Sequence, residues 1–298
     1  MGTKKTHPKK NANSSVHKNN PLMKINLPTR IPHDNLAYSA LIVINEGKSI
    51  GSGFRLKIDG ENYLITAKHV LYNRHGQLYG ENLILTFYSS DKNSTLPWIF
   101  NIDLNDSIIL CSEKHDVAAI LIGKNIATEG FDHSTPLKYL QDEFKRPTKL
   151  IPEPYVKRLQ EGNGSVVSAD VEALGKLDSV LLASDVYVMG YPTSLGMRNS
   201  SFYDFKKPLI RKGIVAGIYL ENSTFVIDSF VFPGNSGGPV VEHCEDGFFR
   251  VVGVVSKYIP YETKWHSNRD DVVNTDVANS GYTVCVAMDE VLTILKKS

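Results

Sequence analysis

The sequence predicts an all-β protein built from two six-stranded antiparallel barrels, and three observations support this fold class. Short apolar runs separated by turn residues occur in two parts of the chain, a spacing typical of small antiparallel barrels. A segment with a different pattern separates the two parts, and an amphipathic stretch at the C-terminus predicts a final helix. With 298 residues, of which 42% are hydrophobic and 22% charged, the chain can bury the cores of two medium domains.

We divide the chain into four parts. Residues 1–34 form a basic tail, 35–123 the N-terminal barrel, 124–183 an inter-barrel insertion and 184–298 the C-terminal barrel with its helix. Seven Lys and Arg residues precede the first acid of the tail, and apolar periodicity is weak. We therefore expect a disordered, solvated tail. A tether to a membrane or nucleic acid is the alternative, because Met1-Gly2-Thr3-Lys4-Lys5-Thr6 formally fits an N-myristoylation pattern.

In the first barrel, apolar and β-branched runs predict strands, and Asp59-Gly60 between two of them is typical of a hairpin turn. The expected strands are Ala37–Asn45, Ser49–Ile58, Tyr63–Ala67, Leu83–Tyr88, Trp98–Asp103 and Ile108–Ile122.

The insertion interrupts this strand pattern. Ser134-Thr135-Pro136, followed by apolar residues at helical spacing, predicts a capped amphipathic helix. A second short helix is expected over Glu153–Glu161, ended by Gly162. The insertion could serve as a lid, as a docking surface or as a surface elaboration without a specific role.

The second barrel has its own strand pattern, followed by a helix. A polar loop of about twenty residues, Pro260–Ser280, is longer than a plain connection requires. Asp289 is the expected N-cap of the C-terminal helix. The expected strands are Val186–Met189, Leu209–Ile218, Phe225–Phe232, Val240–Glu242, Phe248–Ser256 and Tyr282–Ala287.

The stretch Phe232–Val241 places Ser236 at the centre of a turn dense in glycine. Glycines allow backbone dihedrals that point successive N–H groups at one spot, as an acyl-transfer oxyanion requires. Ser236 is therefore a candidate nucleophile. An α/β-hydrolase is the rival class, but its serine opens a helix and precedes its histidine, whereas Pro239–Val241 predicts a strand. The flanking residues that support this assignment are Gly234, Gly237, Gly238 and Pro239.

A serine hydroxyl needs a base, and the base needs an orienting group. His69 lies two residues after the apolar run Leu64–Ala67, with Lys68 between them. Asp116 directly precedes the apolar run Val117–Leu121. The chain order His, Asp, Ser is one of the orders known for a catalytic triad.

The segments Thr66-Ala67-Lys68-His69, Asp116-Val117-Ala118 and Gly234–Pro239 resemble those of chymotrypsin-like serine peptidases, most closely the disulfide-free bacterial HtrA kind. The resemblance covers residues 36–298. It implies a serine endopeptidase for protein or peptide substrates, with the triad His69, Asp116 and Ser236. The oxyanion hole is then expected from the N–H groups of Gly234 and Ser236.

The resemblance also locates the substrate pocket. Phe230 is expected at the base of the primary pocket, and Ser256, Lys257 and Tyr258 are expected at its edge and along the strand that pairs with substrate. Such a pocket would be shallow and apolar, and would accept a small or medium hydrophobic side chain. The 260–280 loop is expected to overhang the groove.

Asn235 stands where relatives activated by cleavage carry an aspartate, so we expect activity that does not depend on such a cut. Control would then come from loop order, substrate supply or a regulatory protein partner. A protease-like binding module with an intact triad and a closed groove is the alternative function, favoured by Tyr258, the insertion and the 260–280 loop.

Composition bounds the remaining questions. Three cysteines cannot form a complete disulfide framework, and they predict free thiols in a reducing compartment. The net charge of +1 argues against a nucleic-acid surface over the whole protein. No stretch predicts a membrane span or a signal peptide, so the expected location is cytoplasmic. The chemistry requires no metal and no cofactor.

Overall fold

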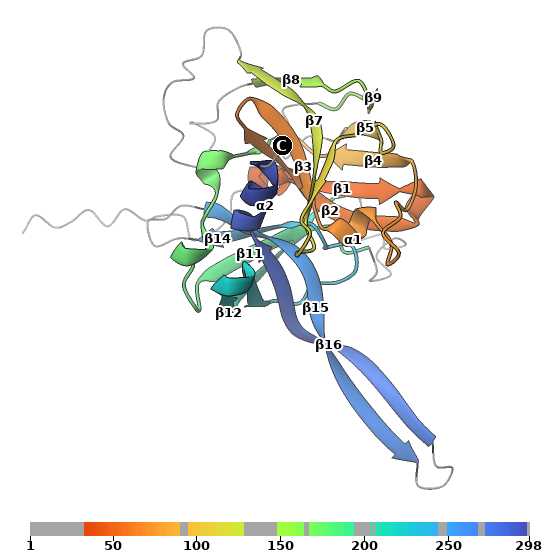
Figure 1. Ribbon diagram of the computed structural model, residues 1–298, viewed down its shortest axis with the longest axis vertical. Coiled ribbons are helices and arrows are strands. Elements are labelled where there is room, and N and C mark those ends of the chain that lie inside the picture. Colours follow the sequence, from red (N-terminus) through yellow and green to blue (C-terminus); the bar gives the residue numbers. More distant parts are fainter. Residues whose placement is uncertain are drawn as a thin grey trace, which may run out of the picture.

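The structure is a computed structural model that describes residues 33–89, 95–127, 148–163, 167–193, 204, 207–243, 249–267 and 272–296. It contains two antiparallel sheets, each rolled around its own core, and a C-terminal helix (Figure 1). The all-β fold class is confirmed.

The first sheet follows the order β6-β7-β3-β2-β1-β4-β5-β9, with β8 paired to β7 and β10 paired to β2, so it has ten strands rather than six. Apolar side chains from successive strands, such as Ile42, Leu64, Leu85 and Ile120, fill its interior. Its strands are β1 Ser39–Ile44, β2 Ser49–Ile58, β3 Glu61–Thr66, β4 Asn82–Phe87, β5 Trp98–Asp103, β6 Ile109–Cys111, β7 Ala118–Ala127, β8 Thr148–Pro152, β9 Val156–Gln160 and β10 Ala169–Asp170.

Two of these strands, β8 and β9, come from the segment 124–183. The helix expected over Glu153–Glu161 is wrong, because residues there form β9, which pairs with the edge of β5 and buries Val156 in the first core. The backbone of this stretch satisfies its hydrogen bonds in the sheet instead of within a helix. The helix expected from Ser134 lies outside the described residues, and the domain boundaries stay a prediction.

The single strand expected over Ile108–Ile122 is also wrong, because the chain folds there into a hairpin of β6 and β7 with Cys111 opposite Ala118. Ser112 shapes the connecting loop, where its hydroxyl accepts the N–H groups of Lys114 and His115 at 3.2 and 2.9 Å. The loop therefore carries Asp116 immediately before the buried start of β7.

The second sheet is a closed six-stranded barrel in the order β11-β12-β13-β16-β15-β14. Its core includes Val188, Phe225, Val240 and Val255. Its strands are β11 Asp185–Gly190, β12 Leu209–Tyr219, β13 Thr224–Asp228, β14 Pro239–His243, β15 Phe249–Ser267 and β16 Val272–Ala287.

The loop expected over Pro260–Ser280 is wrong: β15 and β16 continue as a paired ribbon from Pro260↔Asn279 to Ser267↔Val272. This ribbon projects from the body of the molecule (Figure 1), and we call it the arm. Its composition is polar because both of its faces are exposed, and polarity alone does not separate an exposed ribbon from a loop.

Within the described residues, two α-helices accompany the sheets, α1 Lys68–Leu71 and α2 Met288–Leu295. Asp289 is not the N-cap of α2: Ala287 takes that position, and the Asp289 carboxylate accepts the N–H of Leu177 at 2.8 Å. Short 3-10 turns occur at His33–Tyr38, Asn45–Gly47, Val171–Ala173, Leu177–Ser179 and Leu220–Asn222.

Candidate active site

His69 lies in the single helical turn α1, directly after strand β3 has delivered Thr66 to the interface between the two sheets. Its ring Nδ1 is 2.7 Å from Oδ2 of Asp116, and its backbone N–H donates to Oδ1 of the same carboxylate at 2.9 Å. Two bonds from one residue to one carboxylate fix both the position of the backbone and the orientation of the ring.

Asp116 receives a third hydrogen bond, from the Ser256 hydroxyl to Oδ2 at 2.7 Å. Burial would raise the pKa of this carboxyl. Other interactions outweigh burial and lower the pKa to about 2. They are the hydrogen bond and charge of the His69 ring, the hydrogen bond from the Ser256 hydroxyl and the hydrogen bond from the His69 backbone N–H. Asp116 is therefore held as a carboxylate.

Ser236 lies in a tight turn between the end of the Phe232 segment and strand β14. The N–H of Asn235 donates to Phe232 O at 2.9 Å, and the N–H of Gly238 donates to Asn235 O at 3.0 Å. Gly234 and Gly237 have φ of 103° and 85°, a region that favours glycine. The sequence thus shapes this turn locally.

The turn is also held from outside. The Ser236 carbonyl accepts the N–H of Ser52 at 2.8 Å, and the N–H of Gly237 donates to Val255 O at 2.8 Å. Among the described residues, no acceptor takes the N–H groups of Gly234 and Ser236. The expected oxyanion hole at these two N–H groups stays a prediction.

The Ser236 hydroxyl donates to the carbonyl of Ser256 at 3.1 Å. Within the described part of the chain, no hydrogen bond joins this hydroxyl to the His69 ring. Ser256 therefore contacts both Asp116, through its hydroxyl, and Ser236, through its carbonyl. We expected Ser256 at the pocket edge and did not predict its bond to Asp116; its place at the end of the apolar run Val251–Val255 was the available signal.

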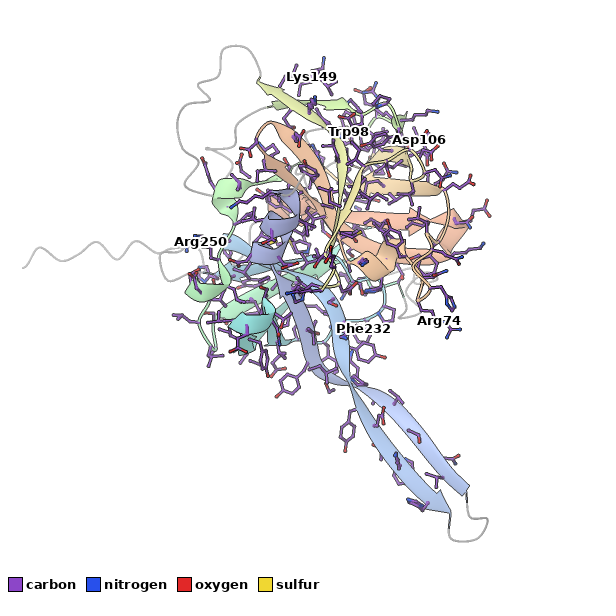
Figure 2. The ribbon with its side chains drawn as sticks, in the orientation of Figure 1. Arg74, Trp98, Asp106, Lys149, Phe232 and Arg250 are labelled. Carbon is purple, nitrogen blue, oxygen red and sulfur yellow. The ribbon has the colours of Figure 1, made fainter. Side chains whose placement is uncertain are left out.

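The residues expected to form the substrate pocket lie around the start of the arm. The Phe230 side chain is 50% exposed, stacks with Phe232 at 6.5 Å between ring centres and approaches Gly281. Lys257 and Tyr258 are exposed on β15, directly after Ser256. Figure 2 labels Phe232 near the base of the arm. Gly281 was not predicted from the sequence as part of this region; a Cβ there would lie 3.2 Å from the Phe230 ring.

Across the described residues, no set of three His, Cys, Asp or Glu side chains is placed to hold a metal ion. Cys111 and Cys285 are free thiols, and burial raises the pKa of both; Cys244 lies outside the described residues. None of the described helices is long and apolar enough to cross a membrane.

Two rolled antiparallel sheets, with a histidine and an aspartate on the first and a serine turn on the second, define a chymotrypsin-like fold. Among solved structures, the chain is similar to the serine endoprotease from Yersinia pestis, with 14% identity and a TM-score of 0.46 over 91% of this chain and 66% of that one. It is also similar to the HtrA-type protease AlgW with tripeptide, with 14% identity and a TM-score of 0.46 over 88% of this chain and 60% of that one. The chain thus spans no more than about two thirds of the length of these solved structures. No family model and no curated protein matches the sequence.

Proposed function

We propose that this protein is a serine endopeptidase that hydrolyses peptide bonds of protein substrates through Ser236, His69 and Asp116. The observation that carries the proposal is the set of hydrogen bonds at the Asp116 carboxylate, which accepts one from the His69 ring, one from the His69 backbone N–H and one from the Ser256 hydroxyl. The carbonyl of Ser256 in turn accepts a hydrogen bond from the Ser236 hydroxyl. A half-buried carboxylate on a histidine ring, with a hydroxyl that joins it to the strand beside the serine turn, supports nucleophilic catalysis.

In the proposed reaction, the Ser236 hydroxyl leaves the Ser256 carbonyl and donates its hydrogen bond to the free ring nitrogen of His69. His69 accepts the proton as the serine oxygen attacks the scissile carbonyl, and the imidazolium that forms is stabilised by Asp116. His69 then donates this proton to the leaving amine. A water molecule hydrolyses the acyl-serine ester by the same route.

The N–H groups of Gly234 and Ser236 are proposed to bind the oxyanion that develops during attack. Two fixed donors lower the energy of this charge more than that of the neutral carbonyl, and each contributes about 3 kcal/mol in comparable sites. Because the turn geometry sets the direction of both N–H groups, the shape of the turn is part of the catalytic machinery.

Phe230 and Tyr258 are proposed to form a pocket that accepts a small or medium apolar side chain. Both aromatic side chains are partly exposed, so an apolar residue can cover them. Equal cleavage after basic and after small apolar residues in a peptide library would contradict this specificity. Cytoplasmic location and control by a regulatory protein partner stay predictions from the sequence.

A protease-like binding module is the second candidate. The observation that favours it is the bond from the Ser236 hydroxyl to Ser256 instead of to His69, because a serine held there is not activated. The two candidates differ in whether the hydroxyl can leave this bond.

Labelling with a fluorophosphonate probe separates them. We expect covalent labelling of the intact protein, loss of labelling in Ser236→Ala, and unchanged labelling in Ser179→Ala, which alters an exposed serine outside the site. Hydrolysis of unfolded casein should fall on the order of 10⁵-fold in Ser236→Ala. A folded protein that neither labels nor hydrolyses casein would support the binding module instead.

A further inference from the structure

Strand β15 has a free edge that begins at the candidate active site. Its pairing with β14 ends at Val254, and the last bond on that side joins Gly237 to Val255. From Ser256 to Ser267, β16 is the sole backbone partner of β15 among the described residues. The free edge therefore runs from the nucleophile along the full described length of the arm (Figure 1).

The position of Pro260 shows which backbone groups face this edge. Proline has no N–H, so the pair Pro260↔Asn279 must be one whose N–H positions point away from the partner strand. The register continues without a shift to Ser267↔Val272. By alternation, the N–H and C=O groups of Glu262, Lys264 and His266 point to the free edge of β15.

These groups lack partners within the described structure, although they lie on a strand of a folded domain. An unpaired edge of this length is a site for the addition of another strand. The edge is continuous with Ser256, whose carbonyl accepts a hydrogen bond from the Ser236 hydroxyl. This continuity favours a peptide substrate as the strand that is added. A chain that adds to this edge is led directly to the nucleophile.

We propose that the arm extends the substrate-binding edge, so that this protein recognises a long, extended, unfolded stretch of substrate on the N-terminal side of the cleaved bond. This inference rests on the proposed peptidase function. Antiparallel addition is more stable per residue than parallel addition. It places the N-terminal part of the substrate along the arm, because β15 runs away from Ser236.

Exposed aromatic side chains give the arm a chemical preference. Tyr261 and Trp265 are 62% and 65% exposed. Their spacing along β15 puts them on the same face of the ribbon, with Thr263 between them. A substrate strand that places apolar residues at alternate positions would cover these rings. The arm therefore favours extended apolar segments, which folded proteins bury and unfolded ones expose.

The test uses the full chain and peptides derived from a cleavage site mapped in unfolded casein. The short peptide spans the scissile bond with only a few residues on either side, a second peptide continues about eight residues further toward its N-terminus, and a third is extended equally toward its C-terminus. We expect the N-terminal extension to raise kcat/KM by about tenfold or more, equivalent to about 1.4 kcal/mol, and the C-terminal one to have a smaller effect.

A pair of proline variants tests the edge itself. Lys264→Pro removes an N–H that faces the free edge and leaves the ladder with β16 intact. Thr275→Pro makes the same change on the outer edge of β16, because Thr275 pairs with Lys264. Lys264→Pro should bring the long-to-short ratio of kcat/KM toward one, while Thr275→Pro should preserve it. A long peptide that is N-methylated at every second amide should lose its higher kcat/KM when the methylated amides are those that bond to the edge of β15. The same peptide with the methyl groups shifted by one residue should keep its higher kcat/KM.

Failure of the inference differs from failure of the proposed function. Absence of fluorophosphonate labelling at Ser236 would overturn both. Labelling and cleavage of the short peptide, with no gain from the extension, would overturn the arm proposal alone. Self-association of the protein that Lys264→Pro abolishes, again with no effect of peptide length, would assign the edge to a second copy of this chain and reject substrate as its occupant.

Discussion

At the scale of single residues, Asp116 shows how burial and hydrogen bonding compete. Burial disfavours its charge, yet two donors from His69 and one from Ser256 favour it more strongly. One of these donors comes from the other half of the molecule. The ionised carboxylate therefore stabilises the folded state as well as orienting the histidine.

The pH dependence of unfolding tests this balance. The pKa of Asp116 falls from an ordinary 3.8 to about 2 on folding, so its stabilising effect is present above pH 3.8 and disappears as pH falls toward 2. We expect Asp116→Asn to be less stable than the parent at neutral pH, by about 2 kcal/mol at most. Urea unfolding should show this difference shrinking toward zero near pH 2. A difference that is constant with pH would contradict the assigned cause.

At the scale of elements, the serine turn depends on glycine for two separable reasons. Gly237 has a φ of 85°, and a Cβ there would lie 2.1 Å from Ser52 O and 2.3 Å from the Thr66 hydroxyl. Gly60, in the hairpin turn, has a φ of 82° but has no atom within 4 Å of its Cβ position. Comparing substitutions at Gly237 and Gly60 therefore separates the effect of steric crowding from the effect of a positive φ.

We expect Gly60→Ala to cost about 1 kcal/mol through backbone strain alone. Gly237→Ala adds a clash with the first sheet and should cost at least about 3 kcal/mol, or prevent folding. It should also slow fluorophosphonate labelling because the turn must shift. Urea unfolding of the two variants gives the comparison. Equal costs would mean that the two sheets do not meet as closely at Gly237 as these distances require.

Elements were predicted well where the side-chain pattern is local. Most strands of both barrels match their expected ranges because alternation and β-branching reflect one buried face. The strand predicted through residues 112–117 is not formed. Apolar runs lie before and after this segment, so the sequence pattern did not indicate the turn that the Ser112 hydroxyl stabilises. The strands over residues 260–280 were not predicted for the opposite reason. Both faces of the arm are exposed, so its sequence has no alternation of apolar and polar residues that would indicate strands.

The candidate site was predictable in its parts but not in its connections. His69, Asp116 and Ser236 each stand in a recognisable local motif. The bond from Ser256 to Asp116 joins residues 140 positions apart, and the local motif of neither residue identifies the other as its partner. Long-range pairing of this kind depends on how the sheets pack against each other.

At the scale of the whole molecule, the two sheets share a buried apolar cluster, and a small number of polar contacts also cross the interface. Ser52 of the first sheet is fully buried; its hydroxyl donates to Gly234 O at 2.7 Å and accepts the N–H of Tyr191 at 2.9 Å. Its backbone N–H also donates to Ser236 O. One residue thus contacts both Gly234 and Ser236 in the turn that carries the proposed nucleophile.

Two buried serines of the first sheet allow this connection to be tested. Ser52→Ala would leave the Gly234 carbonyl and the Tyr191 N–H without their partner, at a cost of about 3 kcal/mol. Ser39 is equally buried, but its hydroxyl has no partner among the described residues, so Ser39→Ala should change stability by less than about 0.5 kcal/mol or increase it. Because Gly234 belongs to the expected oxyanion hole, Ser52→Ala should also slow fluorophosphonate labelling, whereas Ser39→Ala should not. Equal losses in the two variants would show that burial, not the bond across the interface, sets the contribution of Ser52.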